Sequence, residues 1–154
     1  MIYGSGDIAQ VLQVKRGITF FASGVSNSES TDSQAFEREI KLLNSVDRST
    51  HLVYFSTLSI YYSKSEYVAH KIEMERLIQK RFKSWTIIRL GNITWGTNPH
   101  TLLNYLKANP QAQRRDEIRY LIDKDEFLHW IDKIRIGTND IMNITGKQIN
   151  VKEL

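Results

Sequence analysis

A chain of 154 residues, of which 41% are hydrophobic and 25% charged, is long enough for one compact domain with a buried core, and we expect no second domain. The absence of cysteine excludes disulfides, thiolate nucleophiles and cysteine-ligated metals, and no metal site is expected. The formal net charge of +4 is modest, so we do not expect nucleic-acid binding, although a small molecule that carries a diphosphate would suit this charge.

The amino-terminal segment and the hydropathy of the chain predict a cytoplasmic protein that does not associate with membranes. Residues 1–12 lack the basic-then-apolar layout of a signal peptide. No apolar run approaches the length of about 18 residues that a membrane span requires.

The first part of the chain alternates strand and helix signals. Residues 1–4 run from a short apolar strand into a glycine turn, after which Asp7 is expected to cap a helix that ends near Leu12. A second apolar run of strand length covers 18–22 and leads into a loop of turn-forming residues. Apolar residues then recur at helical spacing over 33–44, which predicts an amphipathic helix.

The middle of the chain repeats this alternation. Residues 52–55 form the next predicted strand, which ends in a serine and Thr57; a long helix is predicted over 66–82 and a fourth strand over 85–90. Short strands that are continuously hydrophobic and alternate with helices are typical of βαβ units. The sequence therefore predicts an α/β fold with a parallel sheet covered on both faces.

The pattern is looser toward the carboxyl end. We expect a short helix over 101–107, a strand over 118–122, an amphipathic helix over 125–134, and a turn with a short strand within 142–151. These elements are expected to form a small α/β extension, at about 97–154, on the substrate side of the single domain.

A glycine-rich turn follows the first predicted strand and opens the first predicted helix. Gly4, Gly6 and Ala9 have the spacing of a GxGxxA string, in which backbone without side chains lets a phosphate approach the free N–H groups of a helix start. The string is weak by itself, because a plain turn between strand and helix has the same composition. Its position at the first strand-to-helix junction favours a phosphate-binding role.

A tyrosine and a lysine four residues apart form the second candidate group. Tyr67 and Lys71 lie one turn apart on the predicted helix, close enough for an ammonium to act on a phenol. The same spacing occurs at Tyr120 and Lys124, but there it crosses the end of a predicted strand, where the side chains are separated. Context therefore favours the first pair.

Thr57 completes the predicted group because it ends the strand that precedes this helix. Ligands of open α/β sheets bind beyond the carboxyl ends of the strands, so its hydroxyl can face the same substrate oxygen as Tyr67. A phenol needs its pKa lowered by about 3 units, at a cost of about 4 kcal/mol, to act as a base at neutral pH, and a nearby ammonium helps to supply this. The alternative is that Thr57 caps a turn and Tyr67 is an interface tyrosine.

Three stretches of the sequence have a familiar pattern in the same order. Residues 54–62 read Tyr-Phe-Ser-Thr-Leu-Ser-Ile-Tyr-Tyr, residues 67–71 read Tyr-Val-Ala-His-Lys with Glu75 downstream, and residues 88–96 read Ile-Arg-Leu-Gly-Asn-Ile-Thr-Trp-Gly. Together they resemble the NAD-dependent epimerase/dehydratase family of extended short-chain dehydrogenases/reductases. This resemblance implies a Rossmann-like fold and chemistry on nucleotide sugars.

Two further segments strengthen the resemblance, which extends from Gly4 to about Asp132. Residues 119–123 are similar to the late segment that borders the substrate in that family, and residues 21–28 are similar to the loop beside its cofactor. By resemblance, the cofactor is NAD or NADP, and the residues expected to bind it are Gly4, Gly6, Asp7, Ile8, Ala22, Ser23, Gly24, Tyr67 and Lys71.

The resemblance also implies the remaining roles. Thr57 would polarise the sugar oxygen, Tyr67 would exchange its proton, and Lys71 would hold the nicotinamide ribose and lower the pKa of the tyrosine. A homodimer through helices near 33–45 and 66–82 is implied as well. The residues expected on the nucleotide-sugar side are Ser26, Asn27, Asn92, Arg115 and Arg119, with Arg89 as a further candidate, although surface charge explains the arginines equally well.

The chain departs from the family pattern between the glycine turn and the second predicted strand. The family places two additional strands there, with a residue that selects the adenosine ribose, but only residues 10–17 separate Ala9 from the strand at 18. A crossover of a dozen residues and another strand do not fit into this interval. We therefore predict a shortened Rossmann-like sheet without the second and third strands and with a weakened adenosine site.

These observations support two hypotheses. The first is an oxidoreductase, epimerase or dehydratase-like protein that modifies a nucleotide sugar with the group Thr57, Tyr67 and Lys71. The second is a non-catalytic protein that keeps the fold and binds a nucleotide or a partner. A weakly bound dinucleotide and a smaller ligand both remain open at this point.

Overall fold

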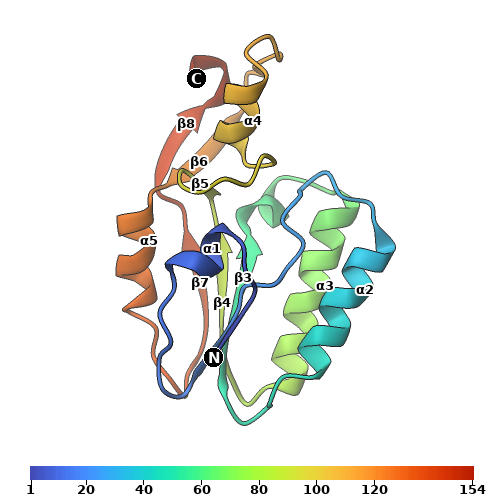
Figure 1. The fold of residues 1–154 in the computed structure, drawn as a ribbon, viewed down its shortest axis with the longest axis vertical. Helices are drawn as coiled ribbons and strands as arrows, with labels where there is room; N and C mark the ends of the chain where they lie inside the picture. The colour runs from blue at the N-terminus through green and yellow to red at the C-terminus, as the bar shows by residue number, and fades with distance from the viewer.

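The computed structural model describes all 154 residues of the chain. A main parallel sheet lies between two layers of helices, and a smaller sheet extends beyond one of its ends (Figure 1). In chain order the elements are β1 (Ile2–Tyr3), α1 (Asp7–Val11), β2 (Ile18–Phe21), α2 (Ser33–Asn44), β3 (His51–Thr57), η1 (Leu58–Tyr61), α3 (Glu66–Arg81), β4 (Ser84–Leu90), β5 (Asn92–Ile93), α4 (Leu102–Ala108), β6 (Ile118–Ile122), α5 (Lys124–Ile131), β7 (Asn139–Ile144), β8 (Lys147–Asn150) and η2 (Val151–Glu153).

The main sheet has the order β1-β2-β3-β4-β7, and every neighbouring pair is parallel. The longest ladder joins β3 and β4, from the pair His51 and Ser84 to the pair Thr57 and Leu90. β1 is an edge strand, and no strand lies beyond it. The prediction of a shortened Rossmann-like sheet is therefore confirmed.

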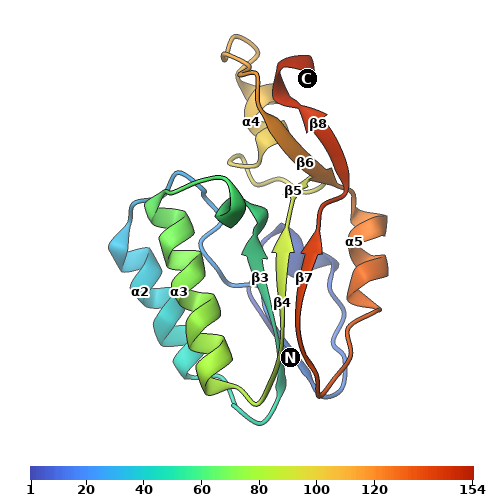
Figure 2. The same ribbon diagram turned by 180° about the vertical axis from the view of Figure 1, so that it is seen from behind.

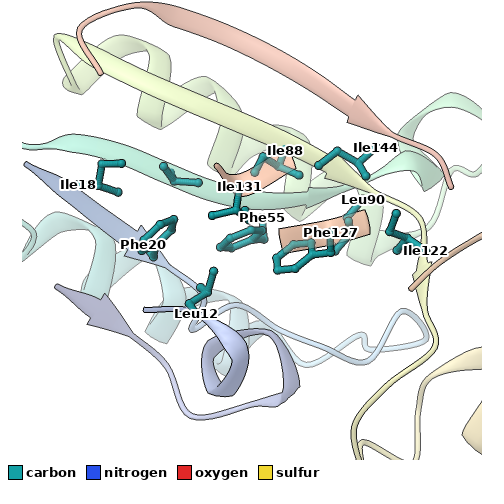
Figure 3. Close-up of a cluster of buried hydrophobic side chains, with 11 residues drawn as sticks. Leu12, Ile18, Phe20, Phe55, Ile88, Leu90, Ile122, Phe127, Ile131 and Ile144 are labelled. Atoms are coloured by element: carbon teal, nitrogen blue, oxygen red, sulfur yellow. The ribbon is translucent and has the colours of Figure 1, made fainter. Parts of the chain in front are cut away.

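Both faces of the main sheet are buried because side chains alternate along its strands. In β3, Val53 and Phe55 point into one apolar cluster while Leu52 and Tyr54 point into the other. The first cluster lies between the sheet and the helices α1 and α5, with Phe55 packed on Phe127 of α5 (Figure 3). Burial of each large apolar side chain contributes about 1.5 to 3 kcal/mol to stability.

The second cluster lies under α2 and α3, which run side by side on the opposite face of the sheet (Figure 2). Each of the longer helices begins at a capping residue whose side chain accepts backbone N–H groups of the first turn. These caps are Asp32 for α2, Ser65 for α3 and Asp123 for α5. Capping fixes where each helix starts, and the loss of a cap costs about 1 kcal/mol.

The smaller sheet stands beyond the carboxyl ends of the main strands (Figure 1). Its order is β5-β6-β8, with β5 and β6 parallel and β6 and β8 antiparallel. α4 lies in the same part of the molecule. This part corresponds to the expected α/β extension.

The carboxyl-terminal segment differs from the sequence prediction. The expected turn and short strand within 142–151 are two strands, since β7 starts at Asn139, joins the main sheet beside β4, and precedes β8. α5 also returns to the main sheet, where Phe127 and Ile131 are buried. The elements that stand apart from the main sheet are therefore α4, the strands β5, β6 and β8, and the short helix η2 that follows β8.

The helices of this structure are all too short or too polar to cross a lipid bilayer.

Candidate active site

A cleft of about 1220 Å³ opens beyond the carboxyl ends of the main strands. This is the edge at which open parallel sheets bind ligands. Its walls come from both the main sheet and the smaller one. Apart from Arg89, the site residues expected from the sequence line this cleft, and their individual roles remain predictions: Gly4, Gly6, Asp7, Ile8, Ala22, Ser23, Gly24, Ser26, Asn27, Thr57, Tyr67, Lys71, Asn92, Arg115 and Arg119.

The two glycines of the opening turn are needed for different reasons. Gly4 has a φ of +118°, and a Cβ atom there would lie 2.3 Å from the carbonyl oxygen of Ala22, so only glycine fits. Gly6 has an ordinary φ of −80°, and a Cβ atom there would meet nothing within 4 Å. The packing of the chain therefore explains Gly4, whereas Gly6 leaves open space in front of the first turn of α1.

Asp7 has a different local role from the one expected. Gly6 is the N-cap of α1, and Asp7 occupies its first turn. The carboxylate of Asp7 accepts the backbone N–H groups of Thr97 at 3.0 Å and Asn98 at 2.8 Å. The glycine at position 96 leaves room for this carboxylate, because a Cβ atom there would collide with it. Asp7 thus anchors the loop after β5 against α1, at the rim of the cleft.

Thr57 ends β3, as predicted, and its hydroxyl is partly used by the chain. The Oγ1 atom accepts the backbone N–H of Ser59 at 3.1 Å and so caps the turn η1. A hydroxyl that accepts one hydrogen bond still has its own proton to donate. The turn-capping role and a role toward a ligand in the cleft are therefore compatible.

Tyr67 and Lys71 are buried on the face of α3 that looks toward the sheet and the cleft. Tyr67 is 9% exposed, and its hydroxyl makes no hydrogen bond within the chain. Because no polar side-chain atom is buried without a partner, this hydroxyl reaches the solvent of the cleft. The Nζ atom of Lys71 donates to the Phe55 carbonyl at 3.3 Å and lies 5.6 Å from the centre of the Tyr67 ring.

The residues predicted for the substrate side differ in whether their side chains already bind other groups of the chain. Asn92 donates its amide to the carbonyl oxygen of Tyr120 at 3.2 Å. Arg119 pairs with Glu117 at 3.1 Å and lies over the ring of Tyr62. Arg115 is exposed, and its guanidinium makes no hydrogen bond or ion pair within the chain.

The loop after β2 supplies the two remaining predicted residues. Ser26 is exposed, and Asn27 is half-buried with its side-chain oxygen accepting the backbone N–H of Glu29 at 3.0 Å. Both lie on the cleft side of this loop. The amide nitrogen of Asn27 and the hydroxyl of Ser26 are left for other partners.

Arg89, the further candidate for the nucleotide-sugar side, lies elsewhere. Its guanidinium donates to Glu75 at 2.7 Å and to the hydroxyl of Tyr61 at 2.7 Å, and it does not line the cleft. Glu75 also accepts the hydroxyl of Ser56 at 2.6 Å. The expectation for Arg89 is therefore wrong: in β4 it points toward α3 and ties that helix and η1 to the sheet.

Sequence reasoning missed a buried carboxylate beside Lys71. Glu39 of α2 is 3% exposed, and its Oε1 atom lies 3.9 Å from the Lys71 Nζ atom. A signal was present, because position 39 follows Phe36 by three residues and precedes Leu43 by four, which puts it on the buried face of its helix. His100 and Tyr105 also line the cleft and carried no signal that distinguished them from surface residues.

Comparison with solved structures identifies the fold. WbmG of Bordetella bronchiseptica, in complex with NAD and UDP, matches 89% of the chain at a TM-score of 0.68 and 16% identity. The dTDP-glucose 4,6-dehydratase of Bacillus anthracis, in complex with NAD, matches 88% at 0.66 and 14%. The dTDP-4-dehydrorhamnose reductase of the same organism, in complex with NADP, matches 87% at 0.62 and 13%.

The chain covers 53% of the first two proteins and 58% of the third, so it spans little more than half of their length. Comparisons with models of protein families and with curated proteins found no match. At the level of the fold, the resemblance to the NAD-dependent epimerase, dehydratase and reductase enzymes is confirmed.

Proposed function

We propose that the cleft binds a nicotinamide dinucleotide and a nucleotide sugar, and that Thr57, Tyr67 and Lys71 carry out proton exchange on the sugar. The observation that carries this proposal is that the glycine turn and these three side chains line one cleft. The similar structures WbmG and dTDP-glucose 4,6-dehydratase were determined with NAD, and the former also with UDP. Their fold and their bound molecules support the same ligand classes here.

The residues present fit the nicotinamide side of such a cofactor. Open space in front of Gly6 leaves room for a phosphate to approach the backbone, where a Cβ atom would intrude. Lys71 brings a cation to the floor of the cleft, and the hydroxyl of Tyr67 is free. When bound, the oxidised nicotinamide supplies an acceptor for the hydride of a sugar carbon.

The chain itself supplies the proton chemistry. Tyr67 removes the proton from the sugar hydroxyl as its carbon becomes a carbonyl, and returns a proton in the reverse direction. Thr57 donates its hydroxyl proton to the same sugar oxygen, while Lys71 favours the phenolate through its charge. The product of the oxidation step is a keto-sugar, from which epimerisation, dehydration or reduction can follow.

Substitution of the tyrosine tests this function directly. Positioned acid–base groups contribute about 10² to 10⁴-fold to a rate, so Tyr67→Phe is expected to reduce turnover of a nucleotide sugar by that factor. The substitution removes one oxygen that makes no hydrogen bond in the chain, so the urea midpoint of unfolding should not change. Unchanged turnover in a folded Tyr67→Phe variant would exclude the proposed chemistry.

The short β1 and α1 side favours a second candidate, a protein that binds a nucleotide or a partner without catalysis. β1 has two residues, α1 has five, and no strand lies beyond them to hold an adenosine ribose. Calorimetric titration with NAD, NADP, UDP-sugars and dTDP-sugars separates the two candidates. Binding of nucleotides without dinucleotide binding at millimolar concentration would favour the second.

Two finer expectations accompany the proposal, a homodimer through α2 and α3 and a cytoplasmic location. Light scattering would detect the dimer as a mass of twice the 17.9 kDa of the chain. A single mass of 17.9 kDa at micromolar concentration would exclude a stable dimer. Cell fractionation checks the location.

A further inference from the structure

Glu39 stands at the centre of a buried polar cluster next to the cleft. Its Oε1 atom accepts the hydroxyl of Tyr54 at 2.8 Å and lies 3.9 Å from the Nζ atom of Lys71. Its Oε2 atom accepts the backbone N–H of Val25 at 3.3 Å and forms a short hydrogen bond with His70. One carboxylate on α2 thereby joins α3, β3 and the loop after β2.

The groups around this carboxylate favour its charged form despite its burial. Burial by itself raises the pKa of Glu39, but Lys71, His70 and the Tyr54 hydroxyl together outweigh that effect, and the pKa is lowered from its ordinary value. A buried anion is tolerated only when it is paired and hydrogen-bonded. Glu39 satisfies this condition with four partners.

The ammonium of Lys71 depends on the same carboxylate. Lys71 is 4% exposed, and Glu39 provides the only carboxylate within 4.0 Å of its Nζ atom. A buried ammonium without a counter-charge loses its proton more readily. Glu39 therefore stabilises the charge that the proposed chemistry requires at Lys71, although Glu39 itself does not line the cleft.

The backbone of the loop after β2 rests against this ion pair. A Cβ atom at Gly24 would lie 2.8 Å from the Lys71 Nζ atom and 2.9 Å from the Glu39 Oε1 atom. The next residue, Val25, donates its N–H to the same carboxylate. The loop after β2 forms one wall of the cleft. It is thus held by the ion pair of Glu39 and Lys71, and Lys71 also provides the charge at the floor of the cleft.

We propose that Glu39 is a positioning residue, which keeps the Lys71 side chain charged and in place and fixes residues 24 and 25 at the wall of the cleft. This inference rests on the proposed function, because it assigns to Glu39 the support of a lysine that binds the cofactor and acts on Tyr67. Glu39 itself does not contact the ligand. A purely structural role, in which Glu39 only satisfies Tyr54 and packs α2 on the sheet, is the alternative.

The protonation of Lys71, followed by NMR of the ¹³C-labelled lysine side chain, tests the inference without any ligand. The Lys71 signal is assigned from its loss in Lys71→Met. In Glu39→Gln the ammonium of Lys71 is expected to lose its proton more readily than in the wild type, since its burial is no longer offset by an anion. In Tyr54→Phe, which removes a hydrogen bond to the same Oε1 atom but keeps the anion, the Lys71 titration should stay close to that of the wild type. An unchanged Lys71 titration in Glu39→Gln overturns the proposal.

Binding of NADH, measured by calorimetry, tests the functional consequence. Glu39→Gln is expected to raise the Kd by about tenfold or more, Glu39→Asp to recover part of the loss, and Tyr54→Phe to stay within about threefold of the wild type. Equal losses in Glu39→Gln and Tyr54→Phe indicate packing alone and overturn the proposal. If the wild-type protein binds no dinucleotide, the proposed function fails, and the Lys71 titration alone decides whether Glu39 holds the ammonium.

A double variant covers the case in which Glu39→Gln is strongly destabilised. If Glu39 acts by balancing the charge of Lys71, then the combined Glu39→Gln and Lys71→Met variant should recover much of the stability that Glu39→Gln loses. If the losses simply add, the two residues are not coupled and the proposal is overturned. Urea unfolding of the wild type, the two single variants and the double variant measures this coupling.

Discussion

The two sides of the cleft differ in the length of their elements and in the number of buried polar contacts that hold them. On the α3 side, Tyr67 and Lys71 sit on a helix of 16 residues that is fixed to the sheet by two buried carboxylates, Glu39 and Glu75. On the glycine side, a two-residue strand and a five-residue helix stand at the edge of the sheet. The buried polar contacts lie on the side where proton chemistry is proposed. The side where the rest of a dinucleotide would lie has only short elements.

This difference teaches that positioning and affinity can be separated within one fold. Chemistry requires a few groups held in a fixed geometry, whereas affinity for a large cofactor comes from contacts far from the reacting atoms. A chain that retains the positioned groups but has lost many of the distant contacts is expected to bind its cofactor weakly while still positioning the reactive end of the cofactor. The predictions below test each side of this comparison.

The largest effect is expected from breaking the α3 side at Glu75. Glu75→Ala leaves the Ser56 hydroxyl without its acceptor and the Arg89 guanidinium without its counter-charge, and removal of one member of a largely buried ion pair is expected to cost about 3 kcal/mol or more. Glu73→Ala, two residues away on the same helix, removes an exposed pair with Arg76 and should leave the urea midpoint almost unchanged. Similar midpoints for the two variants would show that the buried pair does not stabilise this side.

The glycine side is tested by a matched pair of alanine substitutions. Gly4→Ala combines a left-handed φ with a clash at Ala22 and is expected to destabilise the fold by about 2 to 3 kcal/mol. Gly6→Ala meets no protein atom within 4 Å. Its cost to stability should be below about 1 kcal/mol, but it should weaken NADH binding because its methyl group enters the space proposed for a phosphate.

Thermal unfolding and calorimetry measure the two effects separately. If Gly6→Ala binds NADH as tightly as the wild type, the ligand does not approach the turn, and only the α3 side of the cleft is used.

A comparison of whole and half cofactors sharpens the contrast. Reduced nicotinamide mononucleotide carries the reactive ring, its ribose and one phosphate, and it lacks the adenosine half. Because no strand lies beyond β1, its Kd is expected to be within about tenfold of the Kd of NADH, which is at most about 1.4 kcal/mol. Fluorescence titration of both ligands measures the ratio. A preference for NADH of a hundredfold or more would show that the adenosine half is bound after all.

The smallest effect concerns His51, at the opposite end of the sheet from the cleft. Its Nδ1 atom accepts the N–H of Gly137, and its Nε2 atom contacts Thr86 at 2.8 Å, so the neutral ring is satisfied. Burial lowers the pKa of His51, with the carboxylate of Asp140 opposing this. Below about pH 6.5 the unfolded chain takes up a proton that the folded ring resists, so stability declines as the pH falls.

Urea unfolding at pH 7.5 and pH 5.5 checks this sign. The wild type should lose more stability than His51→Gln over this interval, by less than about 1 kcal/mol. An equal decline in both proteins would show that other groups cause the pH dependence.

The sequence predicted most of the main sheet because the central strands are continuous apolar runs bounded by turn residues. β7 is different: it is an edge strand in which Asn139 and Asn143 are exposed, so its run is half polar and looked like part of a turn. The two residues of β5 are too few to give any pattern. Edge position and short length, which depend on the tertiary fold, explain both misses.

The candidate site divides in the same way. The spacing of Tyr67 and Lys71 on a helix and the position of Thr57 at a strand end were enough to predict that the three residues line one cleft. Both features are local properties of an α/β chain. Glu39 was missed because a charged residue on a buried helix face has meaning only once its partners from other elements are known. Arg89 was misassigned for the same reason, since its partner Glu75 lies on another element.

A crystal structure of the chain with NADH tests the central claim most directly. We expect the nicotinamide ring in the cleft, with its ribose within hydrogen-bond distance of Tyr67 and Lys71 and its phosphate in front of Gly6. A dinucleotide bound on another surface, or a cleft whose walls close over the Tyr67 hydroxyl in the presence of NADH, would contradict the account.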